Sequence, residues 1–256
     1  PRTLGLLADP QALPVVKVPV QVHRERKATG AEGDKLMLNE QVTTTRADTG
    51  QELAGYPKTN KGLVIDRRNS EYLDGTEDGR TGGFGLPFHV DKNKSYQVYV
   101  SAARAPLEAK YVATETVQGL ELYVFKVDVK DRPMGAHPDL KLPLVLDSAI
   151  TLRAEPMSGR VVDIEDHATT VSVLHPQRGK LPLFISDVEL TDATVAGQIE
   201  EGKSDRTVLL WLGAYMPWIF VGLGIVLAVG GATGFAWAMK PKVRAASSPQ
   251  QPPYSA

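Results

Sequence analysis

Residues 207–239, TVLLWLGAYMPWIFVGLGIVLAVGGATGFAWAM, decide how the rest of the chain is organised. This stretch contains no Asp, Glu, Lys, Arg or His. It is longer than the roughly 20 apolar residues that cross the hydrocarbon core of a bilayer. We therefore predict one transmembrane helix, with its membrane core at about residues 218–237. The alternative is a buried helix of a soluble protein, but such helices rarely stay uncharged over this length.

Aromatic and basic side chains stand near both ends of this stretch, where the two membrane–water interfaces are expected. The predicted interface residues are Trp211, Tyr215, Trp218, Trp237, Lys240, Lys242 and Arg244. Pro217 should kink the helix, because proline lacks the backbone N–H that the next helical hydrogen bond needs.

The charges on the two flanks predict the orientation of the helix. Three basic residues follow the apolar stretch within residues 240–244, whereas residues 200–206 before it carry both signs of charge. Because cytoplasmic flanks carry the excess of Lys and Arg, the carboxyl terminus should be cytoplasmic and residues 1–206 outside. The tail, residues 240–256, is rich in Pro, Ser and Gln, and we expect it to be disordered. We thus expect a single-pass protein of the cell membrane in a prokaryotic envelope.

Composition excludes several classes of function. The chain has 256 residues, a net charge of −1 and no cysteine. Disulfides, thiolate metal sites and cysteine nucleophiles are therefore excluded, and the balanced charge argues against nucleic acid as a partner. Residues 1–13 lack the apolar segment of a signal peptide. An external domain needs an export signal, so we expect a signal peptide or a membrane helix before Pro1.

Apolar and polar residues alternate over most of the first 190 positions, which predicts β-strands. In the first strand Val16, Val18, Val20 and Val22 share a face, and Pro19 favours the edge of a sheet. The other predicted strands are residues 35–46, 62–66, 96–102, 108–117, 120–130, 144–154, 159–173 and 180–190. A short turn at residues 118–119 should join two of them as a hairpin. Three prolines predict a loop over residues 132–143.

Many short strands followed by one long helix predict a mainly β fold. We expect a strongly curved antiparallel sheet or a β-sandwich outside the membrane, with one C-terminal transmembrane helix. The predicted divisions are an extracytoplasmic β domain at 1–190, a helical stalk at 191–206, the transmembrane helix at 207–239 and the tail at 240–256. Thr191 is the expected N-cap of the stalk, and Asp192 suits its first turn.

No catalytic motif is found in the sequence. Gly-x-Ser-x-Gly, His-Glu-x-x-His and a phosphate-binding glycine loop before a helix are all absent. His167 and Glu165 share one strand face and could form a metal-binding or acid–base pair, but a solvated polar face is the favoured interpretation. We therefore expect neither enzymatic activity nor a cofactor.

One acidic, glycine-rich loop imitates part of a calcium site. In residues 74–85, DGTEDGRTGGFG, oxygens of Asp74, Thr76 and Asp78 have the spacing of the first half of a calcium loop. Gly85 stands where the bidentate Glu is expected, so an ordinary flexible loop is favoured.

Several strands carry apolar side chains on both faces, as residues 120–129 do. One face of such a sheet must be covered by a second layer, a partner subunit or a lipid acyl chain. A plain two-layer core is the simplest solution. If a lipid covers the sheet, the candidate lining is Tyr96, Val98, Val100, Tyr111, Tyr123, Phe125 and Val127.

Small residues recur at four-residue spacing in the membrane stretch. The candidates for helix–helix contact are Gly222, Gly230, Gly234 and Ala238. Because glycine is frequent in membrane helices anyway, association and coincidence are equally open.

Three segments resemble a known family. Residues 111–125, YVATETVQGLELYVF, resemble the hairpin of the PorA family, also called DUF3068, and more weakly that of LolA-like lipid carriers. Residues 155–162, EPMSGRVV, resemble its next turn, with Ser158 where Thr is usual. Residues 191–206, with Met216-Pro217-Trp218 after them, resemble its C-terminal helix and anchor. The resemblance covers about residues 15–240.

This resemblance implies an extracytoplasmic, curved-sheet domain anchored in the cell membrane, in a mostly actinobacterial family whose members often have a membrane helix at each end. Relatives of similar architecture are associated with lipid binding and envelope assembly. We therefore expect a non-enzymatic envelope protein that binds a lipid or lipid-like ligand in its β domain. The alternative is a structural or accessory subunit that assembles with itself or with other envelope proteins through the membrane helix and the sheet edges. The lipid bilayer is an expected partner in either case.

Overall fold

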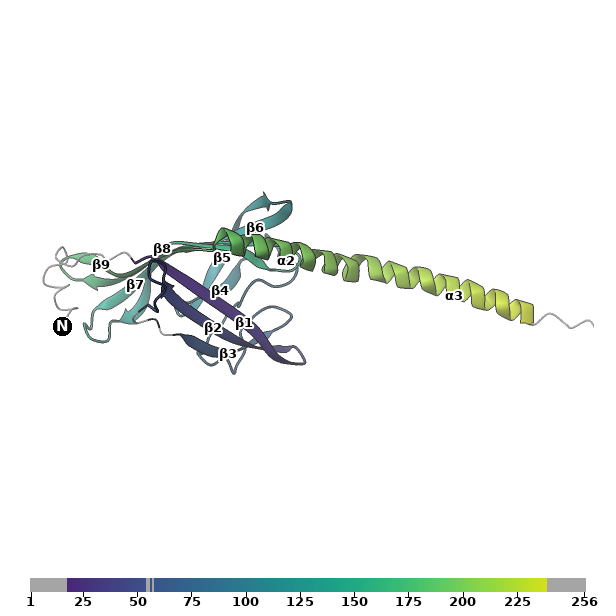
Figure 1. Cartoon of the computed structure of the whole chain (residues 1–256), viewed down its shortest axis with the longest axis horizontal. Helices are drawn as coiled ribbons and strands as arrows, with labels where there is room; N and C mark the ends of the chain where they lie inside the picture. Colours follow the sequence, from purple (N-terminus) through teal and green to yellow (C-terminus); the bar gives the residue numbers. More distant parts are fainter. Residues whose placement is uncertain (1–17, 54–55, 57, 239–256) are drawn as a thin grey trace, which may run out of the picture. The chain divides into compact units, whose positions relative to one another are not determined.

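The computed structural model describes residues 18–53, 56 and 58–238. The chain divides into two compact units, Pro1–Thr207 and Val208–Ala256. The first unit holds two antiparallel sheets and most of a helix, and the described residues of the second are helical (Figure 1). The expected fold class, mainly β with one long apolar C-terminal helix, is confirmed.

The smaller sheet has the order β1-β2-β3. Its strands are β1 (Val20–Glu32), β2 (Lys35–Arg46) and β3 (Thr59–Asp66). β1 and β2 form a hairpin with Gly33 at φ +55° in the turn, a conformation that glycine adopts without strain. One face of this sheet is covered by the segment that follows β3, with Leu63 and Tyr72 buried between them. The part of the first predicted strand that precedes residue 18 lies outside the described residues.

The larger sheet is a meander in which each strand pairs with the next. Its strands are β4 (Tyr96–Val100), β5 (Ala105–Val117), β6 (Leu120–Ala136), β7 (Pro143–Ala154), β8 (Val161–His175) and β9 (Gly179–Glu189). The predicted β5–β6 hairpin is confirmed: Gln118 and Gly119 both have positive φ, as a tight two-residue turn requires.

The loop predicted over residues 132–143 is wrong in its first part, because β6 continues to Ala136. Two register shifts accommodate this continuation, and Pro133 lies opposite Val145 of β7. β5 pairs with β6 only as far as Lys126, so this end of β6 is a local sheet edge on its other side. A proline is tolerated there because no neighbouring strand on that side needs the backbone N–H that proline lacks.

The chain itself covers both faces of the larger sheet. On one face Phe125 and Val127 have no exposed surface and pack with the segment that holds Leu86 and Val90. On the other face a second cluster joins the hairpin and β8 to the helix α2 (Asp192–Leu210); its buried members are Leu120, Leu122, Val162 and Ile199. Of the three coverings that the sequence left open, a second layer from the same chain is the one observed at these positions.

α2 begins as the sequence predicts, because the Thr191 hydroxyl accepts a hydrogen bond of 3.3 Å from the backbone N–H of Thr194. It continues into η1 (Trp211–Tyr215) and α3 (Met216–Ala238). η1 is a π-helical turn in which Met216 N–H bonds to Trp211 O. Pro217 follows directly, and a wider turn relieves the clash between a proline ring and the preceding helical turn. By length and composition this helical run is a candidate membrane span.

Candidate functional site

The three segments that carry the family resemblance converge on one cavity of the first unit. Its volume is about 450 Å³, within the range of small-molecule sites. The β5–β6 hairpin, the β7–β8 turn, α2 and the segment before β4 all contribute to its wall. The lining residues are His89, Val90, Asp91, Glu121, Tyr123, Glu155, Pro156, Met157 and Arg206.

The turn between β7 and β8 forms one side of the cavity. Gly159 has φ +70°, and a Cβ at this position would overlap the carbonyl oxygens of Leu86 and Pro87. The neighbouring segment then runs along the turn: His89 N–H donates to Met157 O at 2.9 Å and Val90 N–H to Pro156 O at 2.7 Å. Turn and segment are therefore joined into one wall, and only glycine fits at their closest approach.

Glu155 is a fully buried carboxylate in this wall. Its Oε2 accepts hydrogen bonds from Ser158 N–H at 2.6 Å and from the Ser158 hydroxyl at 2.7 Å. Its Oε1 has no hydrogen-bond partner among the described residues. A buried acceptor without a partner costs about 1–3 kcal/mol, so a donor that reached Oε1 would be stabilising.

Arg160, next to the turn, fixes α2 against it. Its Nε donates to Asp205 Oδ2 at 2.7 Å, and its Nη1 donates to Glu201 Oε2 at 2.6 Å and to Gln198 Oε1 at 3.1 Å. Gly202 of α2 allows this approach. A Cβ atom at position 202 would lie only 3.1 Å from the side chain of Leu120. These contacts hold the end of α2 in place, and with it Arg206 on the cavity wall.

The cavity combines apolar and ionisable groups. Val90, Tyr123 and Met157 offer apolar contact, whereas Arg206 offers a donor fork and the exposed carboxylate of Glu121 an acceptor. Such a lining suits an amphiphile, whose polar head can exchange hydrogen bonds while its apolar part contacts the other side chains.

The candidate lipid-lining residues come together, but as a packed core. Tyr96, Val98, Val100, Tyr111, Tyr123, Phe125 and Val127 lie on β4, β5 and β6 in one cluster. Ring centroids of Phe125 lie 5.5 Å from Tyr96 and 6.0 Å from Tyr111, in edge-to-face geometry. Of the seven residues, Tyr123 lines the cavity and the others pack between elements of the chain.

Sequence reasoning missed most of the cavity wall. His89, Asp91, Glu155, Met157 and Arg206 were not singled out, because they come from three separate segments and form no local motif. The family-like turn at residues 155–162 was the available signal.

The calcium-like loop makes protein contacts instead of presenting its oxygens together. The Thr76 hydroxyl bonds to the backbone of Val64 and Leu73, and Asp78 Oδ2 accepts from Lys61 and Arg80. In the described part of the chain no three His, Asp or Glu side chains are arranged so that they could hold a metal ion.

His167 lies on an exposed polar patch of β8. Its Nε2 is 3.6 Å from Glu165, and its Nδ1 is 3.2 Å from Asp187. The hydrogen bond with Asp187 raises the pKa of the His167 imidazole. Glu165 is also bound by Arg153 at 2.6 Å, which also binds Asp163. This is a network of surface ion pairs.

The membrane-stretch candidates belong to the second unit. A Cβ on Gly222 or Gly230 would meet nothing within 4 Å, and Trp218 is exposed. The rings of Trp211 and Tyr215 lie 5.3 Å apart. The structure describes only the backbone at Gly234, Trp237 and Ala238. It does not describe Lys240, Lys242 or Arg244.

Comparison with known proteins gives the family. A search among curated proteins finds no match to this chain. A family model described as Porin PorA matches residues 3–233, which include the hairpin, the turn, α2 and most of α3. The PorA resemblance read from the sequence is thereby confirmed, and the chain belongs to the Porin PorA family.

Proposed function

We propose that this chain is a non-enzymatic, membrane-anchored envelope protein that binds a lipid or lipid-like amphiphile in the cavity at residues 155–157. Membership of the Porin PorA family and the apolar C-terminal helix support an envelope protein associated with a membrane. The observation that carries the finer proposal is the convergence of all three family-like segments on a cavity with mixed lining.

Different side chains of the wall would contact the polar head and the apolar tail of such a ligand. Arg206 would donate to an oxygen-rich headgroup, and the exposed carboxylate of Glu121 would accept from a hydroxyl or amine of the same group. Val90, Tyr123 and Met157 would contact its apolar part. A cavity of about 450 Å³ suits a headgroup and the adjoining part of a chain more than a whole lipid.

This places the ligand at the end of the larger sheet instead of over its face. The face that the sequence offered as a lipid surface is filled by Phe125, Val127 and their neighbours. The proposed topology keeps the β domain outside the cell membrane and the carboxyl terminus in the cytoplasm, because the basic residues follow the apolar stretch.

Photo-crosslinking in the native membrane tests the proposal. A benzophenone amino acid replaces Met157 on the wall, and a matched control replaces Val112, which is exposed on β5 and does not line the cavity. We expect an adduct of lipid mass at residue 157 and none at residue 112. Protein adducts at residue 157 without lipid would contradict lipid binding there.

A structural or accessory subunit is the second candidate, favoured by the open glycines of α3. Gly222 and Gly230 leave space that the described chain does not fill, and small residues let membrane helices approach closely. The discriminating experiment measures the size of the detergent-solubilised particle with Gly230→Leu and Gly234→Leu. A smaller particle supports assembly through the helix, and an unchanged size counts against it.

A further inference from the structure

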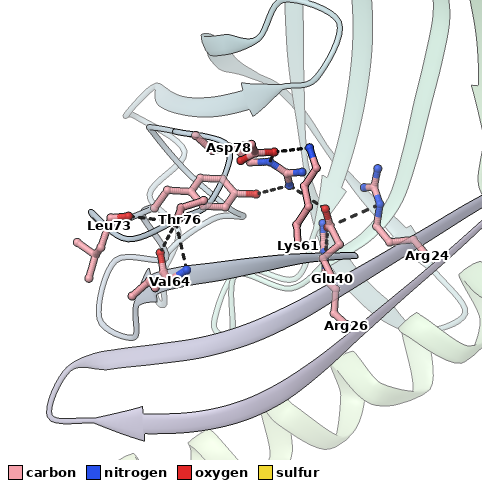
Figure 2. A network of polar contacts seen from close by, with 10 residues as sticks. Arg24, Arg26, Glu40, Lys61, Val64, Leu73, Thr76 and Asp78 are labelled. Atoms are coloured by element: carbon pink, nitrogen blue, oxygen red, sulfur yellow. Dashed lines mark hydrogen bonds and ion pairs between the residues drawn. The ribbon is translucent and has the colours of Figure 1, made fainter. Parts of the chain in front are cut away.

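A cluster of cationic side chains lies on the same face of the smaller sheet as Leu63 (Figure 2). The strand register places Arg26 opposite Glu40 and Glu40 opposite Lys61, so these three form one row across β1, β2 and β3. Arg24 lies two residues before Arg26 and hence on the same face. Arg80, in the segment that follows β3, reaches this row and binds Glu40.

Each carboxylate of the cluster already has two close cationic partners. Glu40 is 2% exposed; its Oε2 accepts from Arg26 Nε at 2.9 Å and its Oε1 from Arg80 Nη1 at 2.8 Å. Asp78 Oδ2 accepts from Lys61 Nζ and from Arg80 Nε, both at 2.8 Å. Each of the two carboxylates is therefore hydrogen-bonded to two cationic side chains other than Arg24.

Arg24 is the surplus cation. Its Nε lies 3.8 Å from Glu40 Oε2, too far for a hydrogen bond, and its side chain is 45% exposed. Burial and the charge of Arg26 lower the pKa of the Arg24 guanidinium below its ordinary value, although the charge of Glu40 raises it. In this network of ion pairs four cationic side chains share two carboxylates.

Aromatic rings hold the other guanidinium groups in place. The Arg26 guanidinium carbon lies 4.4 Å from the centroid of Phe84, and that of Arg80 lies 5.4 Å from Tyr99. Stacking of this kind orients a guanidinium and limits the entropy lost when it binds a ligand. Arg26 donates to Glu40 through its Nε, and its terminal nitrogens make no hydrogen bond within the described chain.

We propose that Arg24 and Arg26 form a binding site for an oxyanion of the phosphate type. Two neighbouring guanidinium forks on one strand face match the oxygens of a phosphate, and the excess positive charge of the cluster favours an anion there. The site shares no residue with the cavity at Glu155, and so it stands whether or not that cavity binds an amphiphile. The phosphate can be free in solution or part of an anionic lipid headgroup.

The test uses the full chain in nanodiscs, with two arms that separate these sources. In the first arm the discs are phosphatidylcholine, and inorganic phosphate replaces chloride at constant ionic strength. In the second arm the discs contain phosphatidylglycerol and the buffer contains no phosphate. The thermal unfolding midpoint of the β domain is measured in both. We expect a rise in at least one arm, and the arm that responds names the source.

Variants tie the response to the site. Arg24→Gln should weaken the phosphate response roughly tenfold in concentration, because one charged fork is lost, and Arg24→Lys should give an intermediate response. Arg67→Gln is the matched control, an exposed arginine in the turn after β3, and should respond like the wild type. No rise of the wild-type midpoint in either arm would overturn the proposal. An Arg24→Gln response equal to that of Arg67→Gln would overturn it too.

Discussion

Arg160 and Asp205 form an ion pair with 2.7 Å between Nε and Oδ2, although they belong to the β7–β8 turn region and to α2. This pair couples two of the three family-like segments that line the cavity. Arg206, the residue after Asp205, reaches the wall because α2 is held at this height. The cavity therefore depends on the docking of α2 as much as on the residues that line it.

Loss of this coupling should loosen α2. Arg160→Met keeps the aliphatic part of the side chain but removes contacts to Asp205, Glu201 and Gln198. We expect the free energy of unfolding of the β domain to fall by about 1–2 kcal/mol, since the three contacts are partly exposed and share one guanidinium. Amide hydrogen exchange should rise in the second half of α2.

Arg68→Met is the control for this prediction. It removes a solvent-exposed ion pair with Asp34, whose side-chain exposures are 75% and 53%. Pairs of this kind contribute about 0–1 kcal/mol. Equal losses in the two variants would mean that Arg160 does not fix α2.

Glycine at position 159 is required for two separate reasons, which a pair of variants can resolve. Gly159→Ala meets both a positive φ and an overlap with the carbonyl oxygens of Leu86 and Pro87, whereas Gly119→Ala meets only a positive φ. The φ penalty alone is about 1–2 kcal/mol. We expect thermal denaturation to show a loss of that size for Gly119→Ala and a much larger loss, or failure to fold, for Gly159→Ala.

The hydroxyl of Ser158 supports the buried carboxylate of Glu155. Ser158→Ala removes one of the two hydrogen bonds to Oε2, and we expect it to lower stability by about 1.5–3 kcal/mol, the range for hydrogen bonds to a charged group. Ser158→Thr keeps the hydroxyl and should stay close to the wild type. Chemical denaturation measures the stability of both variants. A Ser158→Ala variant as stable as the wild type would show that the Ser158 backbone N–H alone supports Glu155.

The Glu40 network should make the β domain sensitive to acid. Burial would raise the pKa of the Glu40 carboxyl, but the hydrogen bond and charge of Arg26 and the charge of Arg24 outweigh it and lower the pKa below its ordinary value of 4.5. A carboxyl with a lowered pKa in the folded state stabilises the protein above its unfolded pKa. That contribution is lost as the pH falls below about 4.5.

Glu40→Gln isolates this effect. At pH 7 the variant should be less stable by about 2–3 kcal/mol, because three guanidinium groups lose their shared carboxylate. As the pH falls from 5 towards 3, the gap between wild type and variant in urea denaturation should shrink. A gap that stays constant over this range would show that Glu40 is not ionised in the network.

Local patterns predicted much of the fold. β2 runs from Lys35 to Arg46 as alternation indicates, and the Gln118–Gly119 turn folds as its residue types require. The end of β6 was missed because Pro133 reads as a strand breaker, and the free edge that tolerates it is a property of the assembled sheet.

The sites were harder to predict than the strands for the same reason. Glu40 shares a face of β2 with Leu36 and Leu38, and no local pattern in the sequence shows that Arg80 reaches it from the segment after β3. The cavity wall combines Glu121, Glu155 and Arg206 from three elements. Their meeting depends on the fit of α2 against the sheet, which no periodicity in the sequence contains.

The most direct test of the central claim is native mass spectrometry of the full chain, purified from its own membrane in mild detergent, as wild type, Arg206→Glu and Lys27→Glu. Both variants change the charge equally, but only Arg206 lines the cavity; Lys27 is exposed on β1. We predict that wild type and Lys27→Glu carry an additional mass in the range of a lipid and that Arg206→Glu lacks it. A wild-type protein without bound lipid, or an Arg206→Glu variant that retains it, would contradict the account.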